Sequence, residues 1–286
     1  MKKASPCAGI ALAVAFAVPL CIAFPAIAAG PHCRDNWICI DEETDGDRIS
    51  LRARNLREYP LTFTLTVRSR SHTIEGDERI TATLLPHESR RAVIMHKRPV
   101  TGRHRYSLDL DWTVGVMDAN HDDDHLYAFP YRQGRTYPVL QGYGSRFSHR
   151  GREEFAVDFD MPEGTPVHAA RGGVVARVVE SNDRGCWEDG CGRYANFIVV
   201  LHSDGTTGEY YHLKEHGALV EEGESVARGQ RIGLSGNTGH TAMPHLHFAV
   251  YHAAEGGQTQ SIPVRFQSAD GVVAVPRRGA RHQAAY

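Results

Sequence analysis

The chain has 286 residues, and its 32 lysine and arginine residues nearly balance its 34 aspartate and glutamate residues, for a formal net charge of -2. Such a balance gives no support to nucleic-acid binding, so nucleic acid is not an expected partner. The length fits one large domain or two modest ones, and we expect two.

The first segment has the layout of a secretory signal peptide. The basic pair Lys2-Lys3 precedes an apolar stretch over residues 10–27, which ends at the small-residue site Ala26-Ile27-Ala28. A single membrane anchor is the alternative, but two prolines interrupt the stretch and small residues end it. We therefore predict a signal peptide over residues 1–28, export to the periplasm or the medium, and no stable membrane anchor after cleavage.

Four of the six cysteines lie beyond this signal peptide, in two close pairs. An even number of cysteines in an exported protein indicates disulfide bonds rather than free thiols. We predict two local disulfides, one between Cys33 and Cys39 and one between Cys186 and Cys191. Neither spacing resembles a zinc knuckle.

Residues 29–117 are predicted to form an antiparallel β-sandwich that acts as an accessory domain. Apolar and polar residues alternate there with the period of strands that bury one face, over residues 61–67 and 106–112, and shorter strands are expected at 80–84 and 92–95. This part of the chain shows no catalytic constellation.

The second half is also strand-rich, and a polar linker over residues 118–126 separates it from the first. His121, His125 and three aspartates in this linker are interpreted as an exposed loop, with cation binding as the alternative. Glycine-marked turns separate the expected strands of a second domain over residues 127–265. These strands are predicted at 155–159, 173–179, 196–202, 208–213 and 245–251. Residues 266–286 lack an apolar period and are expected to be a flexible tail.

Three short segments carry residues suited to metal chemistry. In the strand pattern His245-Leu246-His247, both imidazoles lie on one face while Leu246 points the other way into a core. Asp158 stands opposite the apolar residues of its own strand, where an ionised carboxylate needs a cation or several donors. His212 ends a third apolar strand. Two converging imidazoles suit a zinc site in which one binds the metal and the other faces the substrate.

The sequences of several motifs, and their order along the chain, resemble those of the lysostaphin-type, or LytM-type, zinc metallopeptidases. The resemblance spans about residues 140 to 252, which is less than half of the chain. It rests on the segments Ala156-Val157-Asp158-Phe159, Gly164-Thr165-Pro166-Val167, Ala169 to Val175, Tyr211-His212-Leu213, Gly229-Gln230, Ser235-Gly236-Asn237-Thr238-Gly239 and Pro244-His245-Leu246-His247-Phe248. For the second domain it implies an all-β peptidase fold of the duplicated hybrid motif, built from antiparallel sheets.

The resemblance also implies roles for single residues. Asp158 and His247 would bind one Zn²⁺ per chain, while His212 and His245 would be the catalytic histidines. The family has a third protein ligand, a histidine usually four residues before the aspartate, and this position holds Glu154 here. The first ligand is therefore either Glu154 or the upstream His149. We favour His149, because two histidines and one aspartate leave a net charge of +1 on the site, whereas two carboxylates would neutralise it and weaken the Lewis acid.

The function implied is an endopeptidase that hydrolyses peptide cross-links of bacterial peptidoglycan, with a zinc-activated water as nucleophile. Its partners would be stem or bridge peptides of the wall. The glutamate base of a His-Glu-x-x-His helix is absent from the sequence, so His212 and His245 would divide the proton transfers and oxyanion stabilisation. The alternative is a non-catalytic LytM-type domain that binds the cell wall or activates another wall hydrolase.

Overall fold

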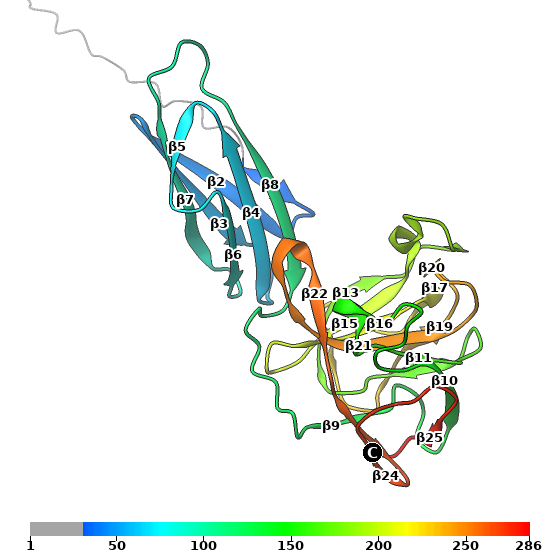
Figure 1. Ribbon diagram of the computed structural model, residues 1–286. Coiled ribbons are helices and arrows are strands. Elements are labelled where there is room, and N and C mark those ends of the chain that lie inside the picture. Colours follow the sequence, from blue (N-terminus) through cyan, green and yellow to red (C-terminus); the bar gives the residue numbers. More distant parts are fainter. Residues whose placement is uncertain (1–30) are drawn as a thin grey trace, which may run out of the picture.

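The protein is almost entirely β-sheet in the computed structural model, which describes residues 31–286 (Figure 1). Two units follow one another along the chain, a sandwich at the upper left of the figure and a larger sheet domain at the lower right. The all-β architecture predicted from the sequence is thereby confirmed. The predicted signal peptide lies outside the described residues. None of the helices within residues 31–286 is long and apolar enough to cross a membrane.

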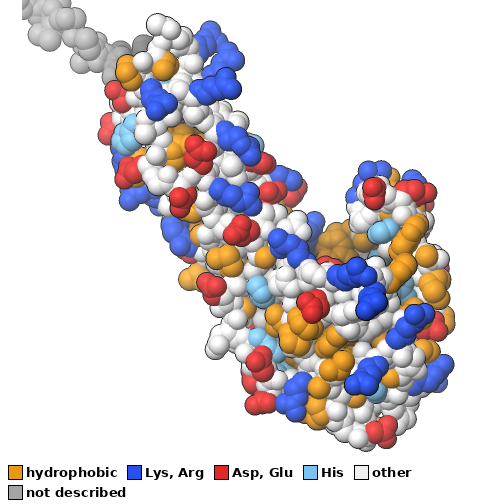
Figure 2. Space-filling model, in the orientation of Figure 1, with side chains coloured by type: hydrophobic (Ala, Val, Ile, Leu, Met, Phe, Trp, Pro, Cys, Tyr) orange, Lys and Arg blue, Asp and Glu red, His pale blue; other side chains and the backbone are white. Residues whose placement is uncertain are grey.

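The first unit stacks a five-stranded sheet on a three-stranded one. The first sheet has the order β1 (His32–Arg34), β2 (Ile38–Asp45), β3 (Arg48–Asn55), β7 (Ser89–Lys97) and β5 (His72–Glu75), and the second has β6 (Arg79–Leu84), β4 (Leu61–Ser69) and β8 (Tyr106–Val114). Leu61, Phe63, Leu65 and Val67 alternate along β4 and are buried between the sheets. A disulfide joins Cys33 on β1 to Cys39 on β2. Figure 2 shows basic and acidic side chains interspersed over this unit.

The second unit is built on one large sheet with smaller sheets packed around it. The large sheet has the order β18 (Ser225–Val226), β13 (Gly173–Val179), β15 (Phe197–Leu201), β16 (Thr207–Tyr211), β21 (Leu246–Ala253), β11 (Val157–Phe159), β10 (Thr136–Gln141) and β25 (Arg281–Gln283), with β22 (Thr259–Ile262) also paired to β21. The smaller sheets are β12 (Pro166–His168), β19 (Arg231–Ser235) and β17 (Leu213–Ala218); β14 (Gly185–Cys186) and β20 (Gly239–His240); and β24 (Gly271–Val273), β23 (Arg265–Ser268) and β9 (Leu126–Ala128). Three short 3₁₀ turns, η1 (Gly151–Glu153), η2 (Cys191–Tyr194) and η3 (Glu255–Gly257), complete the elements, and a disulfide joins Cys186 on β14 to Cys191 on η2.

The two faces of the large sheet have different roles. One face packs on the core of its own unit, where Tyr210, Phe248 and Val157 are buried. On the opposite face, Ala176 of β13 and Val199 of β15 join the apolar core of the sandwich. That face continues across β16 to β21 and β11, beyond the sandwich, and there the polar side chains of the candidate site stand. The sandwich therefore lies beside the site on the same face.

The segment after residue 266 differs from the flexible tail expected from its composition. It forms β24 and β25, and β25 pairs with β10 through residues 281–283 opposite 136–138. Ala284 is buried in the core, and the Tyr286 hydroxyl accepts a hydrogen bond from the Gln133 amide at 2.9 Å. This segment is held in place because its backbone pairs with the edge of a sheet, and such pairing requires no apolar period in the segment itself.

A buried histidine beyond β15 makes stability depend on pH. His202 is 3% exposed, and its Nδ1–H donates to the Gly172 carbonyl at 3.0 Å, while its Nε2 has no hydrogen-bond partner within residues 31–286. Burial lowers the pKa of His202 to about 3. Below about pH 6.5 the His202 imidazole binds a proton in the unfolded chain but stays neutral in the folded chain. The free energy of unfolding therefore falls as the pH drops from about 6.5 towards 3.

We expect the His202→Asn variant to lose less stability than the parent protein between pH 7 and pH 5, by about 2 kcal/mol. Asparagine keeps a donor for the Gly172 carbonyl but does not titrate. Denaturant unfolding of both proteins at the two pH values measures this difference. The matched control is His216→Asn, because His216 is exposed. An unchanged pH dependence in His202→Asn would show that the buried imidazole titrates normally.

Candidate metal centre

Asp158 and His247 face each other across two neighbouring antiparallel strands. They are directly paired in the register of β11 and β21, and both point away from the core that holds Phe159 and Phe248. His247 Nδ1 lies 2.9 Å from Asp158 Oδ1. The strand parity of the two segments therefore places an imidazole and a carboxylate together on one face, as the sequence pattern requires.

His149 joins this pair from the loop before η1. Its ring is 1% exposed, and Nε2 lies 3.2 Å from Asp158 Oδ1. Nδ1 lies 3.2 Å from the carbonyl of Gly142, which can only accept, so Nδ1 carries the proton and Nε2 presents a lone pair. Glu154 is exposed at the end of η1 and lies outside this group. The structure thus brings His149 rather than Glu154 to Asp158.

The three side chains form a cluster that suits a cation. One ligand atom from each of His149, Asp158 and His247 lies within 4.8 Å of the others. The buried Nε2 of His149 has no hydrogen-bond partner among the described residues, which leaves a lone pair in need of one. Two imidazole nitrogens and one carboxylate oxygen are the donors that Zn²⁺ commonly takes, with a fourth position left for water or substrate.

The pKa values of Asp158 and His247 also indicate a site that favours a cation. Burial disfavours the charged carboxylate, but the imidazoles of His149 and His247 outweigh it and hold the pKa of Asp158 well below its usual range. Burial also disfavours a charged His247, yet hydrogen bonds to Asp158 and Glu153 raise its pKa to about 10. The surrounding carboxylates therefore stabilise positive charge at this place, as a metal site must.

His212 and His245 stand together on the other side of the cluster, with ring centroids 4.5 Å apart. His212 Nδ1 donates to the Thr238 carbonyl at 2.7 Å, and His245 Nδ1 donates to the Met243 carbonyl at 2.8 Å. Because carbonyls only accept, both rings are held with the Nε2 lone pair free. His245 Nε2 is 4.0 Å from Asp158 Oδ1.

Both histidines are neutral in this environment. Burial and the nearby His245 and His247 lower the pKa of His212 to about 3, and burial lowers the pKa of His245. His212 also has a left-handed backbone, with φ of 64°, immediately after β16. This conformation is uncommon for residues other than glycine and occurs often at functional sites. It turns the ring out of the strand.

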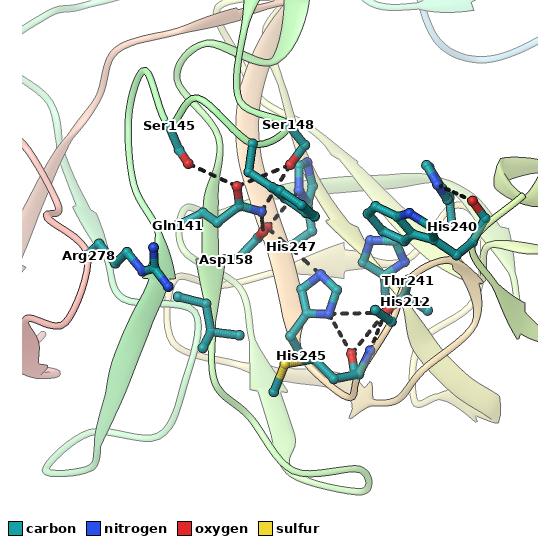
Figure 3. A pocket seen from close by; sticks show the side chains of 15 residues that line it. Gln141, Ser145, Ser148, Asp158, His212, His240, Thr241, His245, His247 and Arg278 are labelled. Carbon is teal, nitrogen blue, oxygen red and sulfur yellow. Dashed lines mark hydrogen bonds and ion pairs between the residues drawn. The ribbon is translucent and has the colours of Figure 1, made fainter. Parts of the chain in front are cut away.

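A pocket of about 360 Å³ opens over these groups (Figure 3). In the figure, Asp158, His247, His245 and His212 converge on its floor, and Arg278 approaches from the opposite wall. Its lining residues all lie after residue 139, so none belongs to the sandwich. The sequence-predicted residues His149, Asp158, His212, His245 and His247 thus meet at one place.

Sequence reasoning missed the groups that hold this cluster. Gln141 Nε2 donates to Asp158 Oδ2 at 2.6 Å, which leaves Oδ1 facing the histidines. Behind His247, Nε2 lies 3.2 Å from the Tyr251 hydroxyl and 3.4 Å from Glu153 Oε2. Tyr251 shares strand parity with His247 and was open to detection on that ground. Gln141 and Glu153 depend on register and on a turn, which no local pattern reports.

The fold and the cluster define the class, an all-β domain that carries a His-Asp-His site of the metallopeptidase kind on one sheet face. Residues 152–261 match the model for Peptidase family M23, so this part of the second unit is a Peptidase M23 domain. The match begins just after His149.

Several named proteins are similar to part of this chain. The peptidoglycan DD-endopeptidase ShyA of Vibrio cholerae is 42% identical over 144 residues, which cover 50% of this chain and 26% of the relative. Lysostaphin of Staphylococcus simulans is 30% identical over 160 residues, which cover 55% of this chain and 29% of the relative. The crystallised catalytic domain of lysostaphin is 30% identical with a TM-score of 0.31, covering 46% of this chain and 88% of that one. The chain spans about a quarter of the length of these curated relatives.

Proposed function

We propose that the protein is a zinc-dependent endopeptidase that hydrolyses peptide cross-links of bacterial peptidoglycan. The observation that carries this proposal is the meeting of His149, Asp158 and His247 beside two imidazoles with free Nε2 atoms. The substrate class comes from relatives named as peptidoglycan DD-endopeptidase and lysostaphin. The three ligands are all present, which favours an enzyme over a non-catalytic wall-binding domain.

His149 Nε2, Asp158 Oδ1 and His247 Nδ1 would hold the zinc, and Gln141 would keep the second carboxylate oxygen turned away by its hydrogen bond. Zinc supplies Lewis-acid polarisation of the scissile carbonyl and lowers the pKa of a bound water from about 15.7 towards roughly 7. The remaining work, which is proton transfer and orientation of the peptide, falls to residues of the chain.

His212 and His245 are placed for these proton transfers. Each presents a neutral Nε2 to the pocket, so one takes the proton of the attacking water and the resulting imidazolium donates it to the leaving amine. The other histidine would stabilise the oxyanion by donating a hydrogen bond from Nε2 in its protonated form. The carbonyls of Thr238 and Met243 fix both tautomers, which removes the need to rotate either ring during turnover.

An exposed aromatic rim borders the pocket and would bind the peptide. Phe147 is 70% exposed and stacks on Trp187, which is 50% exposed, with ring centroids 5.4 Å apart, and Trp187 contacts His240 at 4.3 Å. Phe147 belongs to the loop that carries His149, and Trp187 belongs to the loop closed by the Cys186–Cys191 disulfide. The rim thus bridges two loops at the mouth of the pocket.

We expect Trp187→Ala to raise KM for a soluble cross-linked muropeptide roughly tenfold with little change in kcat, since about 1.5 kcal/mol of apolar contact is lost equally from bound substrate and transition state. Steady-state kinetics on purified muropeptide dimers measure both constants. Leu219→Ala is the matched control, because Leu219 is 47% exposed outside the pocket. A fall in kcat with unchanged KM would argue against a substrate-binding rim.

Export to the periplasm or the medium would place the enzyme where peptidoglycan lies, consistent with the two disulfides. The accessory sandwich, the linker near residues 118–126 and the peptidase domain to about residue 265 form the proposed organisation, and the segment after 266 completes the edge of the peptidase sheet.

The test is incubation of the mature protein with defined peptidoglycan, followed by mass analysis of the released muropeptides. Cleavage of a peptide cross-link that stops with a chelator and returns with Zn²⁺ supports the proposal, and the product masses identify the bond. A protein that binds the wall without releasing muropeptides, with full zinc content, would contradict it in favour of a binding role.

A further inference from the structure

A second layer of ionisable side chains lies behind His247, on the face of the large sheet that carries the metal cluster. His247 and Tyr251 alternate with the core residues Phe248 and Val250 along β21, so both point to this face. Tyr211 of β16 is paired directly with His247 and points the same way. Tyr211 and Tyr251 therefore lie next to the metal cluster on the same sheet face, and the proton transfers proposed above do not use them.

Glu153 is the member of this layer that meets His247. Its Oε2 lies 3.4 Å from His247 Nε2 and accepts the hydroxyl proton of Tyr251 at 2.6 Å. The Tyr251 oxygen itself lies 3.2 Å from the same Nε2. Because the Tyr251 hydroxyl donates its hydrogen bond to Glu153, the Tyr251 oxygen can only accept a hydrogen bond from the imidazole. The Glu153 carboxylate can likewise only accept.

Both neighbours therefore hold a proton on Nε2 of His247. Nδ1, which lies 2.9 Å from Asp158 Oδ1, is then the nitrogen that would bind a metal in place of its proton. Histidines that bind metals commonly donate their other N–H to a carboxylate, which fixes the ring and makes the ligand more basic. Gln141 performs the equivalent task for Asp158 from the other side.

We propose that Glu153, held by Tyr251, is the positioning residue that orients His247 and fixes its metal-binding tautomer. This inference rests on the proposed metal site. Glu153 comes from η1, a turn in the segment between His149 and Asp158. The residues that separate the first two ligands thus supply the support of the third.

The sandwich forms one wall of a cavity beside this carboxylate. The cavity, of about 280 Å³, is lined by Glu209 and Tyr211 of the large sheet, by Glu153 of η1 and by Trp112 and Val114 of β8. The Tyr211 hydroxyl donates to Glu209 at 2.7 Å inside it. The accessory unit therefore borders the outer layer of the metal site, where the Glu153 side chain is 42% exposed, and contributes no residue to the lining of the substrate pocket.

The experiment compares zinc affinity in four forms of the full mature chain: the parent protein, Glu153→Gln, Tyr251→Phe and the control Glu154→Gln. Glu154 is the adjacent carboxylate and is exposed, so it matches Glu153 in chemistry but not in contact. Competition with a chromogenic chelator gives the dissociation constant, and the absorption spectrum of the Co²⁺ form reports the ligand geometry. Neither readout depends on activity.

We expect zinc binding to weaken about 10- to 100-fold in Glu153→Gln and less in Tyr251→Phe, with a changed Co²⁺ spectrum in the first. Glu154→Gln should match the parent protein. Equal zinc affinity in Glu153→Gln and Glu154→Gln would overturn the inference while the metal site stands. A parent protein that binds no zinc would instead overturn the proposed function. If Glu153→Gln fails to fold, as judged by thermal unfolding without metal, an unchanged affinity in Tyr251→Phe would overturn the inference.

Discussion

Replacing His149 by alanine is expected to remove most of the bound zinc and to lower activity by more than about a hundredfold. The Nε2 of His149 is one of three protein donors in the cluster, and it is buried with no other partner in the described part of the chain. Its loss leaves two donors, too few for a stable site, and removes several kcal/mol of transition-state stabilisation. Metal analysis after dialysis and muropeptide kinetics measure the two effects.

The matched control is Glu154→Ala, which removes the alternative ligand four residues before Asp158. Because Glu154 is exposed at the end of η1, we expect parental zinc content and activity in this variant. The reverse pattern, with zinc lost in Glu154→Ala and kept in His149→Ala, would assign the first ligand to the carboxylate. The pair of variants therefore decides between two readings that the sequence alone left open.

Most of the fold followed from a local pattern. The period-2 alternation in residues 61–67 and 106–112 corresponds to β4 and β8, which pair with each other as antiparallel strands. The same parity placed the side chains of Asp158 and His247 off the core face. Alternation reports which face a residue occupies, and that was enough to select candidates for the site.

Pairing between distant strands was not accessible in the same way. That Asp158 lies opposite His247, and Gln141 opposite Asp158, depends on register across strands far apart in the chain. Glu153 is placed by a single 3₁₀ turn, and β25 is ordered by pairing with β10. Each of these is a non-local backbone contact, so composition and periodicity carry no signal of it.

Replacing His212 by asparagine is expected to lower kcat by about 10²- to 10⁴-fold while zinc content stays at the parental level. The reason is that His212 contributes no atom to the ligand cluster but presents a free, neutral Nε2 to the pocket. Asparagine is chosen because it tolerates the left-handed backbone at this position, where φ is 64°, so the loop should keep its shape. Metal analysis, muropeptide kinetics and thermal unfolding are measured together.

His216→Asn is the control for the backbone, since His216 is an exposed histidine that also has a positive φ, of 50°. It should retain parental activity, zinc content and stability. A His212→Asn variant that keeps more than about a tenth of the parental kcat would assign proton transfer to His245 alone. Loss of zinc in that variant would show instead that His212 supports the metal, and the separation between ligands and proton carriers on this sheet face would then be wrong. In both His212 and His245, Nδ1 donates to a backbone carbonyl and Nε2 is free. We therefore expect His245→Asn to show the same fall in kcat and the same parental zinc content as His212→Asn.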